Sequence, residues 1–380
     1  MRRAVSLLLA LAFALSLAAC GGQSAAPTGL GNGWEPTEHI VLDYADQFSI
    51  DRYEGGYRLL TLADGSRFFV VPEGAAVPDG IAKDITVIQR PLGDVYLAAT
   101  SVMCLFDALD SLPAVTLSGT KTDGWYIENA RAAMERGEIL YSGKYSEPDY
   151  ELILQKGCRL AIESTMIRHA PDVREKLEEL GIPVLVDQSS QEGHPLGRTE
   201  WIKLYGALLG KEDEAEEYFA RQKQYLWDAG ATGPTGTTVA FFYISPSGYA
   251  VARRSGDYVT KMIELAGGEY IFSDLGDPDT STSTVSLEME RFYAAAKDAD
   301  VIIYNDTITG SGEQMTLDAL LGKSDLLRDF KAVKTGNVWC TGKNLYQEMT
   351  QLGAVIADIH TVLTEESPDP AALSFLYRLQ

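Results

Sequence analysis

The sequence has few of the residues that most often bind bare metal ions. Only four histidines occur in 380 residues, and no two of them have the HxxxH spacing that places two imidazoles on one helix face. P-loop, GxSxG and HExxH motifs are also absent, and no nucleophile, base and orienting group can be assembled into a catalytic set. The sequence therefore disfavours capture of bare zinc or manganese and indicates a binding protein rather than an enzyme.

Basic residues are scarce as well. The chain has 32 Lys and Arg against 54 Asp and Glu, which gives a net charge of −22 at pH 7. This balance argues against nucleic acid as a partner and against electrostatic adhesion to anionic lipid. Beyond the first 20 residues, no apolar run is long enough to cross a bilayer. A hydrophobic content of 46% with 23% charged residues is typical of a globular protein.

The first 20 residues have the pattern of an export signal. Two arginines precede an apolar stretch over residues 5–17, and Leu17-Ala-Ala-Cys20 follows at once. This arrangement resembles the lipobox of bacterial lipoproteins, which implies that Cys20 carries the lipid; an ordinary cleaved signal with an incidental cysteine is the alternative. Residues 21–37 begin with small and polar residues that suit a flexible tether. We therefore expect an exported protein, lipid-anchored to the outer face of the cytoplasmic membrane.

Three further cysteines remain, Cys104, Cys158 and Cys340. An odd number at scattered positions does not form a disulfide framework. Buried thiols, one disulfide pair and a reducing habitat all remain open interpretations.

The chain is organised around residues 198–230, which have a helical pattern. Trp201, Leu204, Tyr205 and Leu208 recur on one helix face, and a second helix of about 18 residues follows Gly210. At about 1.5 Å per residue this second helix would be roughly 27 Å long, the width of a small domain. Strands alternate with helices on both sides of it. We therefore expect one long rigid helix that joins two α/β lobes.

The predicted fold class is α/β, with two doubly wound, Rossmann-like lobes, a bridging helix and an N-terminal β extension. The first lobe is expected to start with a strand at Ile85–Ile88, and its ligand site at the loops that leave the carboxyl ends of its strands. The expected segments are a signal peptide (1–20), a tether (21–37), the β-rich extension (38–84), the N-terminal lobe (85–197), the bridging helices (198–230), the C-terminal lobe (235–366) and a tail (367–380).

The first lobe and the start of the bridge contain polar candidates for ligand binding. Arg198 suits an anionic oxygen ligand because its guanidinium presents a fork of donors; a salt bridge within the hinge is the alternative. For His194 the alternatives are contact with the ligand and capping of the helix start. Met166 and His169 could ligate a metal centre, or Ser164 and Thr165 could cap a helix while Met166 packs. Two loop serines complete the set, Ser189 and Ser190.

Aromatic and basic residues cluster in the second lobe. Side chains of this kind suit a large, flat or anionic chelate through stacking and ion pairing. Because strand side chains alternate, one of the two consecutive arginines is expected to point to solvent. The second-lobe candidates are Tyr243, Tyr249, Arg253, Arg254, Asn305, Lys343 and Tyr346.

Five phrases in order resemble the substrate-binding lipoproteins of ABC importers for iron–siderophore, haem and cobalamin. These phrases are Leu180-Gly-Ile-Pro-Val-Leu-Val, Leu204-Tyr-Gly-Ala-Leu-Leu-Gly-Lys-Glu-Asp-Glu-Ala-Glu, Ile263-Glu-Leu-Ala-Gly-Gly-Glu-Tyr-Ile-Phe-Ser-Asp, Ala299-Asp-Val-Ile-Ile and Phe330-Lys-Ala-Val-Lys-Thr-Gly-Asn-Val-Trp. The resemblance covers about residues 85–365. It implies a monomer that captures a metal chelate between its lobes and delivers it to an ABC permease with its ATPase.

The resemblance also implies one glutamate on each lobe that docks to the permease. The candidates are Glu151 in the first lobe and Glu288 or Glu290 in the second; a solvated helix face is the alternative for each. A ferric siderophore-type chelate is the expected cargo, with haem or a corrinoid as the close alternative. A double-lobed metal-handling enzyme and a surface sensor or adhesion lipoprotein are the alternatives from other classes.

Overall fold

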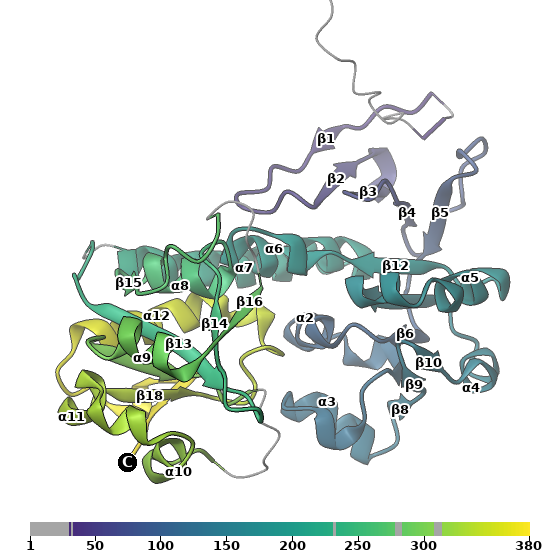
Figure 1. Cartoon of the computed structure of the whole chain (residues 1–380). Coiled ribbons are helices and arrows are strands. Elements are labelled where there is room, and N and C mark those ends of the chain that lie inside the picture. The colour runs from purple at the N-terminus through teal and green to yellow at the C-terminus, as the bar shows by residue number, and fades with distance from the viewer. Residues whose placement is uncertain (1–29, 32, 231–232, 278–282, 308–313) are drawn as a thin grey trace, which may run out of the picture.

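The computed structural model describes residues 30–31, 33–230, 233–277, 283–307 and 314–380. Cys20 and the signal peptide therefore lie outside the described residues. Two α/β lobes lie on one side of a pair of helices, α6 and α7, and a separate β-sheet lies on the other side (Figure 1). The predicted fold class, two α/β lobes with a helical bridge and a β extension, is confirmed.

The N-terminal sheet has five strands in the order β1-β2-β3-β4-β5. All neighbours are antiparallel except β4 and β5, which are parallel. The strand that we expected to open the first lobe at Ile85–Ile88 is formed, but it is β5 of this sheet, so the extension continues past residue 84. The strands are β1 (Glu38–His39), β2 (Phe48–Arg52), β3 (Arg58–Leu62), β4 (Arg67–Val71) and β5 (Ile85–Gln89).

The first lobe has a five-stranded sheet in the order β12-β11-β6-β7-β8, in which every pair is parallel. The carboxyl ends of the strands therefore meet at one edge, where ligand loops are expected. The strands are β6 (Val95–Leu97), β7 (Val115–Ser118), β8 (Leu140–Tyr141), β11 (Leu160–Ser164) and β12 (Val184–Asp187). A short hairpin, β9 (Gly143–Lys144) and β10 (Glu147–Pro148), accompanies helices α2 (Met103–Ala108), α3 (Glu128–Glu135), α4 (Tyr150–Gln155) and α5 (Pro171–Glu179).

The second lobe has a mixed seven-stranded sheet in the order β16-β14-β13-β17-β18-β19, with β15 paired to β13. Its centre, β13, β17 and β18, is parallel, but β14, β16 and β19 run antiparallel to their neighbours. The strands are β13 (Thr238–Ile244), β14 (Ala250–Arg253), β15 (Glu269–Tyr270), β16 (Thr284–Leu287), β17 (Val301–Tyr304), β18 (Val338–Thr341) and β19 (Leu376–Arg378). The helices are α8 (Tyr258–Leu265), α9 (Met289–Ala296), α10 (Leu317–Leu321), α11 (Lys331–Thr335) and α12 (Leu352–Thr364).

The C-terminal residues are part of the second lobe. We expected residues 367–380 to form a tail, but β19 pairs with β18. Phe375 and Leu376 are only 2% and 4% exposed. This apolar burial, absent from a solvated tail, holds the last strand in the sheet.

The bridge is a pair of packed helices, α6 (Pro195–Leu209) and α7 (Glu212–Gly230). The chain turns at Gly210, whose φ of +78° favours glycine. The two helices approach so closely that a Cβ on Gly206 would lie 2.7 Å from the Cβ of Ala215. One end of α7 meets the N-terminal sheet, where Glu212 pairs with Arg58 at 3.1 Å. The other end packs on α12 of the second lobe, so α7 spans the molecule as expected.

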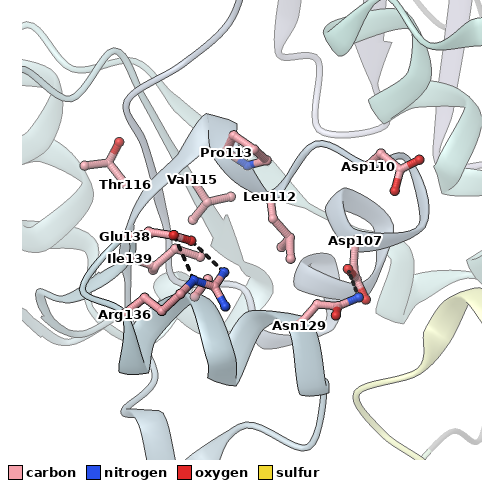
Figure 2. A pocket seen from close by; sticks show the side chains of 11 residues that line it. Asp107, Asp110, Leu112, Pro113, Val115, Thr116, Asn129, Arg136, Glu138 and Ile139 are labelled. Carbon is pink, nitrogen blue, oxygen red and sulfur yellow. Dashed lines mark hydrogen bonds and ion pairs between the residues drawn. The ribbon is translucent and has the colours of Figure 1, made fainter.

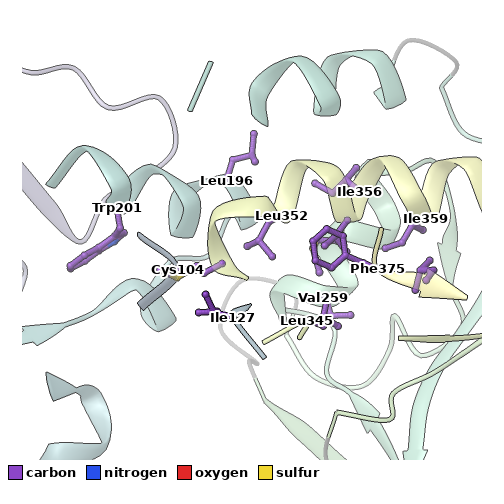
Figure 3. Packing of buried hydrophobic residues seen from close by; sticks show 14 of the residues in the cluster. Cys104, Ile127, Leu196, Trp201, Val259, Leu345, Leu352, Ile356, Ile359 and Phe375 are labelled. Atoms are coloured by element: carbon purple, nitrogen blue, oxygen red, sulfur yellow. The ribbon is translucent and has the colours of Figure 1, made fainter. Parts of the chain in front are cut away.

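One apolar core runs through the N-terminal sheet, the first lobe, the bridge and the second lobe. Figure 3 shows this continuity, from Trp201 and Cys104 to Leu352, Ile356 and Phe375. The lobes are therefore joined by buried apolar contacts as well as by the chain. Among the described residues, no helix has the length and apolarity needed to cross a membrane.

Two buried glutamates attach the N-terminal sheet to the bridge. Glu200, 0% exposed, accepts hydrogen bonds from the backbone N–H groups of Asp43, Tyr44 and Ala45 at 2.8–2.9 Å. Glu192 accepts from the Asp46 and Gln47 backbone and from Trp201 Nε1. A buried carboxylate is stable only when its oxygens are hydrogen-bonded in this way. Residues 43–47 are therefore fixed to the start of α6.

We predict that Glu200→Ala lowers the free energy of unfolding by about 3 kcal/mol, because it leaves three part-buried N–H groups without their acceptor. Urea unfolding followed by circular dichroism measures the change. Glu217→Ala is the matched control, since Glu217 is exposed on α7 and its loss should cost less than about 0.5 kcal/mol. Equal effects of the two substitutions would show that the hydrogen bonds to Glu200 contribute nothing to the free energy of unfolding.

Candidate functional site

A small cavity of about 50 Å³ lies between the two lobes. Its first-lobe side is formed where strands β6 and β12 end, and its second-lobe side by α8 and the segment that leads into α12. This is the edge at which parallel sheets present ligand loops. The residues that line it are Ser101, Ser189, Ser190, Arg198, Tyr258, Leu345, Tyr346, Met349 and Leu352.

Arg198 joins the two sides of this cavity. Its guanidinium carbon lies 3.8 Å from the centre of the Tyr258 ring, and its Nη2 donates to the Ser190 carbonyl at 2.9 Å. The buried Nε has no hydrogen-bond acceptor among the described residues. Burial lowers the pKa of Arg198, while Tyr258 and Asp257 raise it. Arg198 forms no ion pair with any described residue. The alternative of a salt bridge within the hinge therefore does not explain the position of its side chain.

A second basic group lies behind Tyr346. The Tyr346 hydroxyl accepts hydrogen bonds from Arg253 Nη2 and from Asn305 Nδ2 at 2.8 Å. Burial lowers the pKa of Arg253, but Tyr346 and Asp257 raise it by more than burial lowers it. The net shift of the Arg253 pKa is therefore upward. Lys343, on the same loop as Tyr346, lies 3.8 Å from Asp306 Oδ2. Arg253 and Asn305 therefore lie behind Tyr346, and neither they nor Lys343 line the cavity themselves.

The other first-lobe candidates lie at or beside the cavity but have local roles. Thr165 contacts Ser190, with 3.3 Å between their hydroxyl oxygens. Ser164 caps the turn that follows β11 by accepting from the Met166 N–H. Met166 is 46% exposed and His169 is also exposed. Neither side chain lines the cavity, so the structure places neither of them at this site.

His194 caps α6. Its Nδ1 accepts a hydrogen bond from the Leu196 N–H at 3.1 Å, and its ring stacks on Tyr44 with 4.3 Å between centroids. Burial, with a smaller contribution from Lys261, lowers the pKa of His194 to about 4. The imidazole is therefore neutral and able to accept at neutral pH. The capping role is the one the structure shows.

Three second-lobe candidates do not reach the cavity. Tyr249 is 38% exposed, and Tyr243 and Arg254 are half-buried, but none of them lines it. One of the two consecutive arginines was expected to point to solvent, but Arg253 and Arg254 are both half-buried. The proposed docking residues, Glu151 on α4 and Glu288 and Glu290 at the start of α9, are exposed.

The three cysteines are free thiols, with Cys104 and Cys340 buried and Cys158 half-buried. Within the part of the chain that the structure describes, no three His, Cys, Asp or Glu side chains converge as a metal site.

A wider cavity of about 670 Å³ lies in the first lobe (Figure 2). It is lined by Val115 and Thr116, at the amino end of β7, and therefore lies at the sheet edge opposite the interlobe cavity. Its polar groups pair with each other: Arg136 Nη2 donates to Glu138 at 2.7 Å, and Asn129 donates to Asp107 at 3.0 Å. This cavity is accordingly not the ligand site that the strand topology predicts.

Comparison with known proteins agrees with this geometry. Residues 98–345 match the periplasmic binding protein family, a range that includes the bridge and most of both lobes. The chain belongs to the periplasmic binding protein family. Membership confirms that this chain is a solute-binding protein rather than an enzyme. Proteins of this family act on the outer side of the cytoplasmic membrane.

Relatives of this periplasmic binding protein include two uncharacterized lipoproteins of Methanocaldococcus jannaschii. One is 26% identical over 352 residues, covering 87% of this chain and 81% of the relative. The other is 25% identical over 318 residues, covering 80% and 78%.

Solved structures share the fold. A periplasmic haem-binding protein of Vibrio cholerae has a TM-score of 0.58 and 17% identity, covering 71% of this chain and 98% of its own. A protein of an Fe³⁺-hydroxamate transport system from Saccharomonospora viridis has a TM-score of 0.53 and 19% identity, covering 71% and 93%.

Sequence analysis missed several residues of this site. Leu345, Met349 and Leu352 line the cavity, but an apolar residue near a helix start gives no functional signal.

Glu163 was also missed, because a glutamate at the end of a buried strand is ambiguous in sequence. Its side chain is 0% exposed, and neither carboxyl oxygen has a hydrogen-bond partner among the described residues.

Burial raises the pKa of Glu163 to about 8, so the folded periplasmic binding protein holds this carboxyl neutral. The unfolded chain ionises it near 4.5. The stability that Glu163 contributes is therefore fully present below about pH 4.5, and it is lost as the pH rises through about 8.

We predict that Glu163→Gln flattens the fall in unfolding free energy between about pH 5 and pH 9, since the amide is neutral throughout. Urea midpoints measured across this range test it. Glu175→Gln, on the exposed face of α5, serves as the control. Parallel curves for wild type and Glu163→Gln would contradict the assignment.

Proposed function

We propose that this periplasmic binding protein captures an anionic metal chelate of the ferric siderophore type between its lobes and delivers it to an ABC permease. The observation that carries the proposal is Arg198. This guanidinium lies in the interlobe cavity and has a buried Nε without an acceptor. A buried donor without a partner is costly, and an anionic ligand oxygen would satisfy it with a charge-assisted hydrogen bond.

The second-lobe cluster supports an anionic cargo. Arg253 donates to Tyr346, which lines the cavity, and it is also paired with Asp257, as Lys343 is with Asp306. Tyr346 and Asn305 add neutral polar groups that orient oxygen atoms. Chelates with carboxylate, catecholate or hydroxamate oxygens have this complementary chemistry.

Haem is the second candidate, because the rings of Tyr258 and Tyr346 both line the cavity and aromatic faces suit a flat macrocycle. A corrinoid would use the same surfaces. Among the proteins with this fold, one is a haem-binding protein and another belongs to an Fe³⁺-hydroxamate transport system.

The cavity of about 50 Å³ is much smaller than the roughly 300–1,000 Å³ of a typical small-molecule site. The lobes must therefore separate before any of these chelates can enter.

Delivery to the permease would use the exposed glutamates and the lipid anchor. Glu151 lies on the first lobe and Glu288 and Glu290 lie on the second, so one acidic contact per lobe is available to a basic partner surface. Lipid on Cys20 would keep the protein close to the permease.

We predict that Arg198→Met weakens binding of the best ferric chelate by about 10- to 100-fold, because the anionic oxygen loses its buried partner. The panel comprises ferric citrate, a ferric tris-catecholate, a ferric trihydroxamate, haemin and cyanocobalamin, followed by tryptophan fluorescence and calorimetry. Arg131→Met, half-exposed on α3, is the control. Binding of cyanocobalamin alone, or of no compound, would overturn the anionic-chelate proposal.

We further predict that Glu151→Lys combined with Glu290→Lys reduces uptake of the chelate by cells at least tenfold while leaving its affinity unchanged, since like charges then face the permease. Glu175→Lys combined with Glu217→Lys is the matched charge change on other exposed helix faces. Normal uptake by the double variant would exclude these residues from docking.

A further inference from the structure

The two lobes are connected across the cleft by the side chain of Gln347. Its Oε1 accepts a hydrogen bond from the Tyr126 backbone N–H at 2.8 Å, and its Nε2 donates to the Gly124 carbonyl at 2.7 Å. Gln347 belongs to the second lobe and the two backbone groups belong to the first. One amide thus uses both its acceptor and its donor to hold the opposite lobe.

The first-lobe half of this connection is rigid. Trp125 lies between the two bonded residues and is 1% exposed. Its Nε1 lies 3.3 Å from Ser118 Oγ, at the end of β7, and the next apolar residue, Ile127, is 2% exposed. The backbone groups at Gly124 and Tyr126 are therefore held in place by the core of the first lobe.

The second-lobe half is equally fixed, and it includes the cavity. The Gln347 N–H donates to the Asn344 carbonyl at 2.8 Å. The preceding residue, Tyr346, lines the cavity and receives hydrogen bonds from Arg253 and Asn305. A ligand that displaces Tyr346 would consequently move the residue that holds the lobes together.

We propose that Gln347 acts as a clasp: its two hydrogen bonds to Tyr126 and Gly124 hold the ligand-free cleft closed. The cargo can then enter only when these two hydrogen bonds are broken. The cavity left by the closed clasp is about 50 Å³, too small for a chelate. Two neutral, partly exposed hydrogen bonds shift the ratio of closed to open molecules by about tenfold. This is enough to hold the cleft closed and weak enough for a ligand to displace. The clasp itself is independent of the proposed function, which enters only through the identity of the cargo.

The test compares Gln347→Met with Gln224→Met. Methionine is close in size to glutamine but makes neither hydrogen bond, and the Gln224 amide bonds only within α7. Nitroxide labels are attached through a ketone-bearing amino acid at positions 135 and 323, which lie at α3 of the first lobe and just after α10 of the second (Figure 1). Pulsed electron spin resonance on the full chain in detergent then gives the distances between the lobes without ligand.

We expect one short distance for wild type and for Gln224→Met, and an open population about tenfold larger for Gln347→Met. Identical distributions for all three proteins would overturn the clasp. For ferric citrate, or whichever panel compound binds, Gln347→Met should lower Kd, by up to about tenfold, because less of the protein is held closed. A higher Kd would show that Gln347 stabilises the loaded state and would also overturn the proposal. If no panel compound binds but the distances still change, the clasp is supported and the proposed cargo is wrong.

Discussion

The close contact between α6 and α7 at Gly206 is the constraint on which both lobes depend. The space beside Gly206 is filled by Ala215 and the Lys211 carbonyl, and a Cβ there would lie within 3 Å of both. Any larger residue would push the helices apart and disturb everything packed on either side of them. On α6 those neighbours include Asp187 at the end of β12, whose carboxylate accepts from the Tyr205 hydroxyl at 2.9 Å. On α7 they include α12, where the Gly353 backbone lies against Gln222.

Three partly buried cations lie in or behind the interlobe cavity of this acidic protein. Arg198, Arg253 and Lys343 are all shielded from solvent to a large extent, and each lies near an aromatic ring or a carboxylate from the second lobe. Desolvated charges attract an opposite charge more strongly than exposed ones. The surrounding negative field does not favour approach of an anion. The anionic cargo that we propose would therefore be selected by fit and hydrogen bonding inside the cleft rather than by long-range attraction.

Much of the architecture could be predicted because its signals are local. The periodic apolar residues of α6 and α7, Gly210 between them and the alternating strands and helices of the first lobe are all visible in the sequence. The assignment of β5 and β19 was wrong because strand pairing is decided by partners distant in the chain, β4 and β18. Arg198, Tyr346 and Ser189 were found from their positions at strand ends and at the hinge. Gln347 and Glu163 were not, because their significance lies in contacts and burial that no local pattern encodes.

The N-terminal sheet limits how the cleft can open. Asp43 pairs with Lys223 on α7 at 2.6 Å, and Glu200 on α6 holds the same segment, so one loop fixes both helices of the bridge. Motion between α6 and α7 would break these contacts, whereas other contacts join the start of α6 to the second lobe. Two of them are the Thr199 hydroxyl on the Met349 carbonyl at 2.9 Å and Arg198 on Tyr258. The anionic cargo that we propose would, on taking Arg198 away from the Tyr258 ring, bind where the bridge meets the second lobe.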